Sequence, residues 1–357
     1  MSRVEKVRAE MQRRQLDAFI SLRPENRSYL TGFTGTAGMA VVTATGAYLL
    51  TDFRYVEQAQ AQAPGFAVRQ VGRSNRYAEE LKKILQEEGI RRVGFESDYL
   101  TVDAHNRYAG ELAGVDLVPA AGLVEGIRRV KEPEEIEAIR RAAALADEAF
   151  DHILRFLRAG VTEREVALEL EFFMRRRGAG ALAFDTIVAS GPRSSLPHGV
   201  ASDRAIGRGD LVTLDFGCVV DGYCSDMTRT VAVGEPDEKQ REIYAIVLEA
   251  QERGLVAVRA GVAARDVDAA CRDFIAARGY GENFGHSTGH GVGRAVHEEP
   301  RLAAEVDDVL VPGNVVTVEP GIYLPGWGGV RIEDLVLVTE TGCEILSRSP
   351  KALIVLE

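Results

Sequence analysis

The segment LDFGCVVDGYCSD, residues 214–226, places two aspartates inside a stretch that otherwise predicts a β-hairpin. Apolar residues flank an Asp-Gly pair, which is a strong signal for a two-residue hairpin turn. Aspartate is depleted in strands, and a buried carboxylate without a partner is costly. Asp215 and Asp226 therefore need a positive partner, and Arg229 is the only basic side chain near them in the sequence.

The geometry of such a hairpin brings the two aspartates together. A turn centred on Asp221-Gly222 places Asp226 opposite Gly217 and makes Asp215 its diagonal neighbour on the same face. Diagonal neighbours lie about 7–8 Å apart at Cα, which is close enough for their carboxylates to converge. Converging carboxylates repel each other unless they share a proton or a cation. The alternative is two solvated aspartates on an edge hairpin.

A second acidic pair interrupts two apolar runs in VVTVEPGIYLPGWGGVRIEDLVLV, residues 315–338. Glu319 and Glu333 are symmetric about Gly326, so a simple hairpin would set them face to face. The flanking VVTV and LVLV runs are typical of buried strands. Four acids embedded in four predicted strands argue against a solvated surface.

Histidines cluster in the same part of the chain. Of six histidines, four fall between residues 198 and 297, namely His198, His286, His290 and His297. Glycines surround the last three, so this loop can bring a side chain close to a ligand. Imidazole and carboxylates form a metal-ligand set, and two divalent cations would balance four carboxylates beside one histidine. Oxygen-rich ligands favour Mn²⁺, or Co²⁺ and Fe²⁺, over a thiolate-type zinc site.

The chain divides into two patterns. Residues 1–124 alternate between helical and strand-like periods, which predicts an α/β domain. In residues 125–357, a long helix that starts at Pro133 and stops near Gly160 precedes a second helix and then strand-rich segments. Thr162 and a glutamate three residues later have capping-box spacing for the second helix. We expect an α+β domain here, with a curved antiparallel sheet flanked by helices.

Whole-chain properties exclude several functional classes. The formal net charge is −11, which argues against a general nucleic-acid binder or a protein of anionic membranes. No apolar run of about 18 residues predicts a membrane span, and the charged N-terminus has no signal-like core. The four cysteines form no C-x-x-C pair, which favours free thiols in a reducing cytoplasm.

The acids and one histidine resemble the dinuclear metal site of the pita-bread metallopeptidases, in the order Asp215, Asp226, His290, Glu319 and Glu333. That family includes aminopeptidase P, prolidase and methionine aminopeptidase. The matching strings are LDFGCVVDGYCSDMTRT, HSTGHGVGRAVHEEP, VEPGIY and GGVRIED. GGVRIED, together with the N-terminal YLTGFTGTAG of a creatinase-like domain, is similar to the Xaa-Pro peptidase branch. Creatinase itself shares the fold but lacks this ligand set.

The resemblance implies two divalent cations per subunit, typically Mn²⁺ or Co²⁺, and hydrolysis of the bond before proline by a metal-bridging hydroxide. It implies that Glu319 is both a metal ligand and a proton shuttle. It also implies that His198 and His297 contact the carbonyl oxygen and the tetrahedral intermediate. Tyr323 and Arg331 are predicted to contact substrate or to support the ligands.

Three alternatives for the function stay open. An Xaa-Pro dipeptidase, or prolidase, is favoured because the chain is short, and an aminopeptidase P acting on longer Xaa-Pro peptides is the alternative. A metal-free binding protein is the third, which the complete set of ligand positions disfavours. The expected partners are peptides with proline second and another copy of the chain in a homodimer, with no nucleic acid and no membrane. His286 has either a supporting or a purely structural role.

Overall fold

The structure is a computed structural model that describes residues 1–72 and 76–357. It consists of two compact units, Met1–Arg128 and Arg129–Glu357. The sequence pattern placed the division after residue 124, which lies inside helix α6 (Leu123–Arg128). The first two residues of α6 are buried in the core of the N-terminal unit, so the whole helix belongs to that unit.

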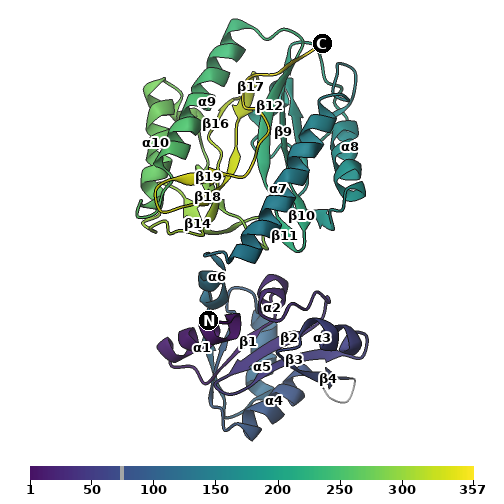
Figure 1. The fold of residues 1–357 in the computed structure, drawn as a ribbon, viewed down its shortest axis with the longest axis vertical. Coiled ribbons are helices and arrows are strands. Elements are labelled where there is room, and N and C mark those ends of the chain that lie inside the picture. Colours follow the sequence, from purple (N-terminus) through teal and green to yellow (C-terminus); the bar gives the residue numbers. More distant parts are fainter. Residues whose placement is uncertain (73–75) are drawn as a thin grey trace. The chain divides into compact units, whose positions relative to one another are not determined.

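The N-terminal unit is an α/β domain built on one mixed six-stranded sheet in the order β4-β3-β2-β1-β5-β6 (Figure 1). Its strands are β1 (Ala18–Ser21), β2 (Met39–Thr43), β3 (Ala47–Asp52), β4 (Ala67–Val71), β5 (Arg92–Phe95) and β6 (Asp116–Pro119). Strands β1, β2 and β3 pair antiparallel, and the other pairs are parallel. The sheet therefore has the mixed pairing expected of alternating helices and strands.

Helices cover both faces of this sheet. They are α1 (Arg3–Arg13), α2 (Pro24–Thr31), α3 (Val56–Gln62), α4 (Tyr77–Glu87), α5 (Val102–Glu111) and α6. One hydrophobic cluster joins the sheet to α1, α2, α3 and α6, and another joins it to α4 and α5. Every residue of β1 is buried, as expected for a central strand covered on both faces.

The C-terminal unit packs four long helices against mainly antiparallel sheets (Figure 1). The helices are α7 (Pro133–Ile153), α8 (Glu163–Arg176), α9 (Glu238–Ala257) and α10 (Ala264–Ala277). Helices α7 and α8 share a hydrophobic cluster with a four-stranded sheet, whose strands in order are β20 (Val355–Leu356), β12 (Met227–Val233), β9 (Asp210–Phe216) and β8 (Ile187–Ser190). This sheet is antiparallel except for the β12–β20 pair.

Helices α9 and α10 share a second cluster with the other sheet of this unit. Its strands in order are β14 (Glu298–Leu302), β13 (Gly289–Gly291), β15 (Val315–Val318), β18 (Asp334–Val338) and β19 (Cys343–Ile345). Shorter pairings complete the unit, formed by β7 (Ala181–Leu182), β10 (Cys218–Val220) and β11 (Tyr223–Cys224), and by β16 (Gly321–Leu324) and β17 (Gly328–Arg331). The predicted α+β class of this unit is confirmed.

The ends of α7 and α8 show which helix boundaries the local sequence predicts. Helix α7 begins at Pro133 as predicted, but it ends at Ile153 and not near Gly160. The main-chain N–H groups of Phe156 and Leu157 both donate to the Ile153 carbonyl, which closes the helix in a tight turn. The predicted capping box of α8 is present, with Thr162 as the N-cap.

Both acidic hairpins have the register that their turns predict. Asp221 and Gly222 have φ angles of 51° and 79°, the left-handed pair that a type I′ turn requires. Thr228 lies opposite Asp215 in the β9–β12 ladder, and the β10–β11 ladder continues the same register beyond Asp226. The turn thus fixes which residues of the hairpin share a face.

The second hairpin opens at its acids. Val318 pairs with Asp334 at the end of the β15–β18 ladder, and the β16–β17 ladder resumes in the same register. Glu319 and Glu333 fall in the gap between these ladders, opposite each other. The Glu319 N–H donates to the Thr288 carbonyl and the Glu333 N–H to the Thr228 carbonyl, so neighbouring segments hold both acids.

Candidate metal centre

Three carboxylates from different segments converge in the C-terminal unit. Asp215 lies on β9, Asp226 directly before β12, and Glu333 directly before β18. One oxygen from each lies within 4.8 Å of the others, and all three residues are largely shielded from solvent. The two hairpins that sequence analysis singled out therefore bring their acids to one place.

Two of these carboxylates each keep one oxygen without a protein partner. Asp215 Oδ2 accepts a hydrogen bond from Arg331 Nη2 at 2.6 Å, but Asp215 Oδ1 is buried with no partner. Glu333 Oε2 accepts from the Thr228 hydroxyl at 2.7 Å, but Glu333 Oε1 is likewise buried and unpaired. A buried acceptor without a donor is costly, so such oxygens suit a cation.

His290 and Glu319 complete the cluster. His290 Nε2 lies 3.2 Å from Glu319 Oε1 and 3.6 Å from Asp226 Oδ2. His290 Nδ1 lies 3.1 Å from the Gly291 carbonyl, to which it can only donate, so Nε2 is the nitrogen that faces the acids and that a cation could bind in place of a proton. A histidine held in this way is typical of metal ligation. All five predicted ligands thus meet.

The pKa values of the acids reflect their crowding. Burial and the charges of the neighbouring carboxylates raise the pKa of Asp226 and of Glu333 well above the ordinary range. Burial alone would also raise the pKa of Glu319, but the hydrogen bond and charge of His290 lower it to about 2. Divalent cations would relieve this repulsion, so the oxygen-rich donor set with one imidazole fits such ions.

Arg331 and Tyr323 are buried beside the acids and bind protein groups. Arg331 Nη1 donates to the Tyr323 hydroxyl at 2.8 Å and to the Pro197 carbonyl at 3.1 Å, while Nε donates to the Thr228 hydroxyl at 3.1 Å. The Tyr323 hydroxyl also lies 2.8 Å from His286 Nε2, which gives His286 a supporting position. Direct substrate contact by Arg331 and Tyr323 stays a prediction.

The two histidines predicted to touch substrate are exposed at the same centre. The His297 ring lies 4.3 Å from the His290 ring, at an interplanar angle of 64°. His198 directly follows Pro197, whose carbonyl Arg331 holds. Both side chains are exposed; the ring of His297 contacts the cluster at His290, whereas His198 is linked to it only through the main chain of Pro197.

The expected role of Arg229 is wrong. Arg229 is buried and donates to Asp334 Oδ1 at 2.8 Å, to the Ser349 carbonyl at 2.7 Å and to the main-chain oxygen of Glu333. Side chains alternate along a strand, so Arg229 points away from the face that carries Asp226. Arg331, from the other hairpin, is the positive partner that Asp215 receives.

Two threonines at the site escaped sequence analysis. The Thr228 hydroxyl bonds both Glu333 and Arg331, and the Thr317 hydroxyl donates to Glu319 Oε1 at 2.9 Å and accepts from the His290 N–H at 3.1 Å. Thr228 lies two residues after one acid and Thr317 two residues before another. The two-residue period of a strand was the signal that could have identified them.

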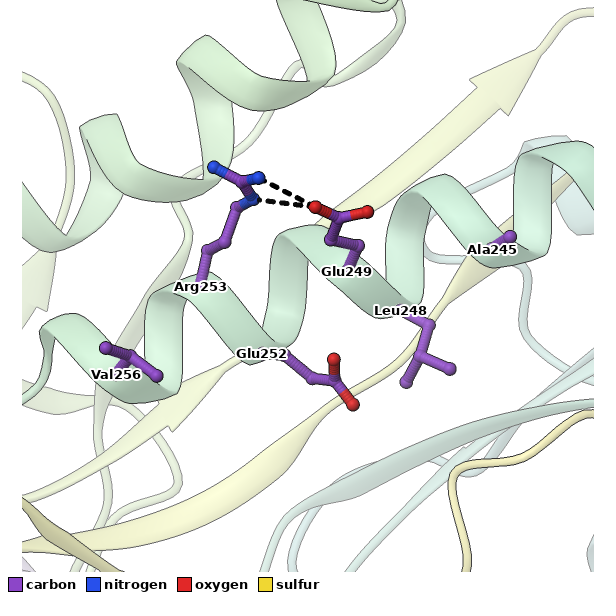
Figure 2. A pocket seen from close by; sticks show the side chains of 6 residues that line it. All are labelled: Ala245, Leu248, Glu249, Glu252, Arg253 and Val256. Carbon is purple, nitrogen blue, oxygen red and sulfur yellow. Dashed lines mark hydrogen bonds and ion pairs between the residues drawn. The ribbon is translucent and has the colours of Figure 1, made fainter.

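A hollow of about 510 Å³ on the surface of α9 is distinct from these residues (Figure 2). Its lining side chains all come from α9, and Figure 2 shows Arg253 paired with Glu249 there. None of the predicted site residues lines it. The converging acids, not this hollow, are the candidate site.

Among the helices that the structure describes, none has the length and apolar character needed to cross a membrane.

Comparison with known proteins agrees with this geometry. Residues 137–340 match the metallopeptidase family M24, and residues 3–130 match the creatinase/prolidase N-terminal domain. The chain is 40% identical to the Xaa-Pro dipeptidase of Pyrococcus horikoshii, over 99% of this chain and 98% of that protein.

Two solved structures extend the likeness to the whole fold. The Xaa-Pro dipeptidase from Bacillus anthracis has a TM-score of 0.97 and 50% identity, with 99% of each chain covered. The X-Pro aminopeptidase from Thermotoga maritima has a TM-score of 0.92 and 40% identity, with 100% of each chain covered. By its family match, its fold and its converging acids, the chain belongs to metallopeptidase family M24.

Proposed function

We propose that this chain is an Xaa-Pro dipeptidase, which hydrolyses the peptide bond before a proline in the second position. Two divalent cations, Mn²⁺ or else Co²⁺, would be held by Asp215, Asp226, His290, Glu319 and Glu333. The observation that carries this proposal is the buried cluster of acids, in which one oxygen of Asp215 and one of Glu333 have no protein donor, beside a histidine whose Nε2 faces the acids. When bound, such cations would polarise the scissile carbonyl and lower the pKa of a bound water.

Glu319 is the group that can move the proton in this reaction. Its carboxylate lies within the cluster, with Oε1 3.2 Å from His290 Nε2, so it is placed to accept a proton from the attacking water. The departing proline nitrogen must gain a proton, and Glu319 then supplies it. The Thr317 hydroxyl, which donates to Glu319 Oε1, holds the carboxylate in place during both transfers.

The exposed histidines can bind the substrate oxygen. We infer that His198 and His297 donate hydrogen bonds to the carbonyl oxygen and to the negative charge that develops on it. Arg331 holds the carbonyl of the residue before His198, so we expect Arg331 and Tyr323 to influence substrate binding through the groups that they hold. The amide of an Xaa-Pro bond has no N–H. An enzyme that binds the carbonyl and the free amine therefore loses no hydrogen bond with this substrate.

Metal removal tests the proposal directly. Purified protein treated with a chelator and desalted should lose activity on Ala-Pro and recover it with Mn²⁺ or Co²⁺. Elemental analysis should find two ions per chain, and an absence of bound metal would favour a binding protein without catalysis. Glu319→Gln should remove turnover while the far-UV circular dichroism stays unchanged, and a fully active variant would exclude Glu319 as the proton carrier.

A length series decides between two peptidase activities. Aminopeptidase action is the second candidate, because the Thermotoga maritima structure, which matches over 100% of both chains, is named an X-Pro aminopeptidase. We expect kcat/KM to be highest for Ala-Pro and to fall for Ala-Pro-Ala and longer peptides. The opposite order would identify an aminopeptidase P. Sedimentation of the same samples tests the homodimer that we expect by analogy.

A further inference from the structure

A buried ion pair lies beside the loop that carries His297. Lys131 Nζ is 3.2 Å from Glu298 Oε2, and the two side chains are only 1% and 8% exposed. The Lys131 main chain is held as well, because its N–H donates to the Gly313 carbonyl at 2.8 Å. An ammonium group is costly to bury without an opposite charge, and Glu298 supplies such a charge to Lys131.

Glu298 in turn shapes the loop before it. Its Oε1 accepts a hydrogen bond from the Ala295 N–H at 2.9 Å, and the Gly293 N–H donates to the Ala295 carbonyl at 3.0 Å. A Cβ atom at Gly293 would lie 2.5 Å from Glu298 Oε2, so the carboxylate fills the space that the missing side chain leaves. The turn over residues 293–297 is therefore folded around this carboxylate.

His297 has little else to fix it. In the described part of the chain, the ring contact that we find for His297 is with His290, and its side chain is otherwise exposed. Its position must therefore be set by its own main chain. Glu298 is the next residue along that chain, and its strand β14 pairs with β13, with Glu298 opposite Gly291.

We propose that Lys131 and Glu298 are a positioning pair, which holds the main chain of His297 so that its imidazole faces the acidic cluster. The expected effect on turnover rests on the proposed function of His297. The expected effect on the position of His297 rests on geometry alone. Neither residue touches the reacting atoms. Misplacement of a catalytic group by about 1 Å can cost up to about 100-fold in rate, so the pair controls turnover through His297.

The first test compares Glu298→Gln with Glu299→Gln in the Mn²⁺-loaded full chain. Glu299 is the neighbouring residue of the same type on the same strand, but it is exposed, so it is a matched control. We expect Glu298→Gln to lower kcat on Ala-Pro by about 10- to 100-fold. Mn²⁺ affinity, measured by calorimetry, should stay within about twofold of the natural protein in both variants, because neither residue is a proposed metal ligand and the effects of independent sites agree to about this factor. An unchanged kcat would overturn the proposal.

The second test separates positioning from general destabilisation. In a His297→Ala background, Glu298→Gln should cause no further loss of kcat, because both changes act through the same imidazole. Equal losses in both backgrounds would mean that the pair acts elsewhere and would overturn the proposal. If Glu298→Gln does not fold, Glu298→Asp replaces it, since the shorter carboxylate keeps the charge but cannot reach both Lys131 and the Ala295 N–H.

A third measurement does not depend on turnover. In the metal-free full chain, the NMR ring signals of His297, assigned from His297→Ala, should shift in Glu298→Gln and stay in place in Glu299→Gln. If the natural protein shows no activity on any Xaa-Pro peptide but these signals shift, the proposed function fails and the positioning pair stands. If the signals do not move, the positioning pair fails even in an active enzyme.

Discussion

Glu333 and Asp334 are neighbours in sequence and equally buried, at 1% and 0% exposure, yet they lie in opposite electrostatic surroundings. Asp334 accepts hydrogen bonds from Arg229 Nη2 and Lys351 Nζ, both at 2.8 Å, and from Gln251 Nε2 at 3.0 Å. Glu333 receives one hydroxyl, and its other oxygen has no protein partner. The side of the strand that carries Asp334, the neutralised face, provides positive partners for its buried carboxylate. The side that carries Glu333, the open face, does not.

The difference shows what an unpaired acid means in this fold. At the start of β18, two positive side chains and one amide surround Asp334. The fold thus supplies hydrogen-bond donors to a buried acid that has a structural role. On the opposite face Glu333 adjoins two further acids, Asp215 and Asp226, and Arg331 pairs with only one of the three, so the protein relieves only part of their repulsion. Such an arrangement is stable when a cation supplies the missing charge.

The largest effect should come from disturbing the neutralised face. Asp334→Asn leaves the buried Arg229 and the partly buried Lys351 without an opposite charge, which costs about 3–5 kcal/mol of unfolding free energy. Urea unfolding of the metal-loaded protein measures this, with Asp307→Asn, an exposed acid, as the control. A loss below about 1 kcal/mol, the range of surface pairs, would show that this face is not held by its charges.

The matched change on the open face should behave differently. Glu333→Gln removes one of several repelling charges, so we expect the metal-free protein to keep or gain stability at pH 7. Its affinity for Mn²⁺, measured by calorimetry, should fall by about 100-fold or more, because a charged ligand is lost. A large loss of metal-free stability with unchanged Mn²⁺ affinity would mean that both faces are structural.

These two faces also mark what could be predicted from the sequence. The two-residue turn at Asp221-Gly222 and the symmetry of the second hairpin determined the register locally, so the convergence of Asp215 with Asp226 followed from the chain. The partner of Asp215 did not follow, because Arg331 comes from the other hairpin, 116 residues away. Nearness in sequence favoured Arg229 instead, which strand alternation turns to the opposite face.

The exact end of the first unit and the Lys131–Glu298 pair depend on tertiary contacts in the same way, although the sequence placed the division within four residues of the structural one. Whether helix α6 packs with the N-terminal unit depends on contacts with α1 and α2, which no local periodicity encodes. Lys131 and Glu298 are 167 residues apart, and each looks like an ordinary surface charge in its own segment. Turns and periodicity determine local geometry, whereas the partners of buried charges depend on the tertiary fold.

A smaller effect should follow from Thr228→Val, which keeps the shape of the side chain and removes its hydroxyl. Glu333 Oε2 then loses its donor, so the carboxylate is less well oriented for a cation. We expect Mn²⁺ affinity to fall by about tenfold, at the low end for groups that orient a ligand. Thr228→Ser restores the hydroxyl and should recover most of the affinity. An equal loss in Thr228→Ser would mean that the hydroxyl alone does not account for the Mn²⁺ affinity.

The most diagnostic effect is the pH dependence of stability without metal. Burial and mutual repulsion raise the pKa of Asp226 and Glu333 in the folded chain, so the folded state holds their protons more tightly than the unfolded state. Their contribution to stability is therefore complete below about pH 4, the ordinary carboxyl range, and is lost as the pH rises through the raised values. Glu319 has the opposite sign, because its pKa of about 2 contributes stability above the ordinary range and loses it in acid.

Urea unfolding with chelator present should thus show the free energy of unfolding falling from pH 5 to 8, by at most about 1.4 kcal/mol per pH unit for each proton involved. Saturating Mn²⁺ should flatten this slope, because the cation replaces the protons that the acids would otherwise need. Glu333→Gln should reduce the slope without any metal, whereas the exposed control Asp307→Asn should leave it unchanged. A slope that is the same with chelator and with Mn²⁺ would mean that the unpaired oxygens of the open face do not bind the cation, and the contrast between Glu333 and Asp334 would then have no bearing on catalysis.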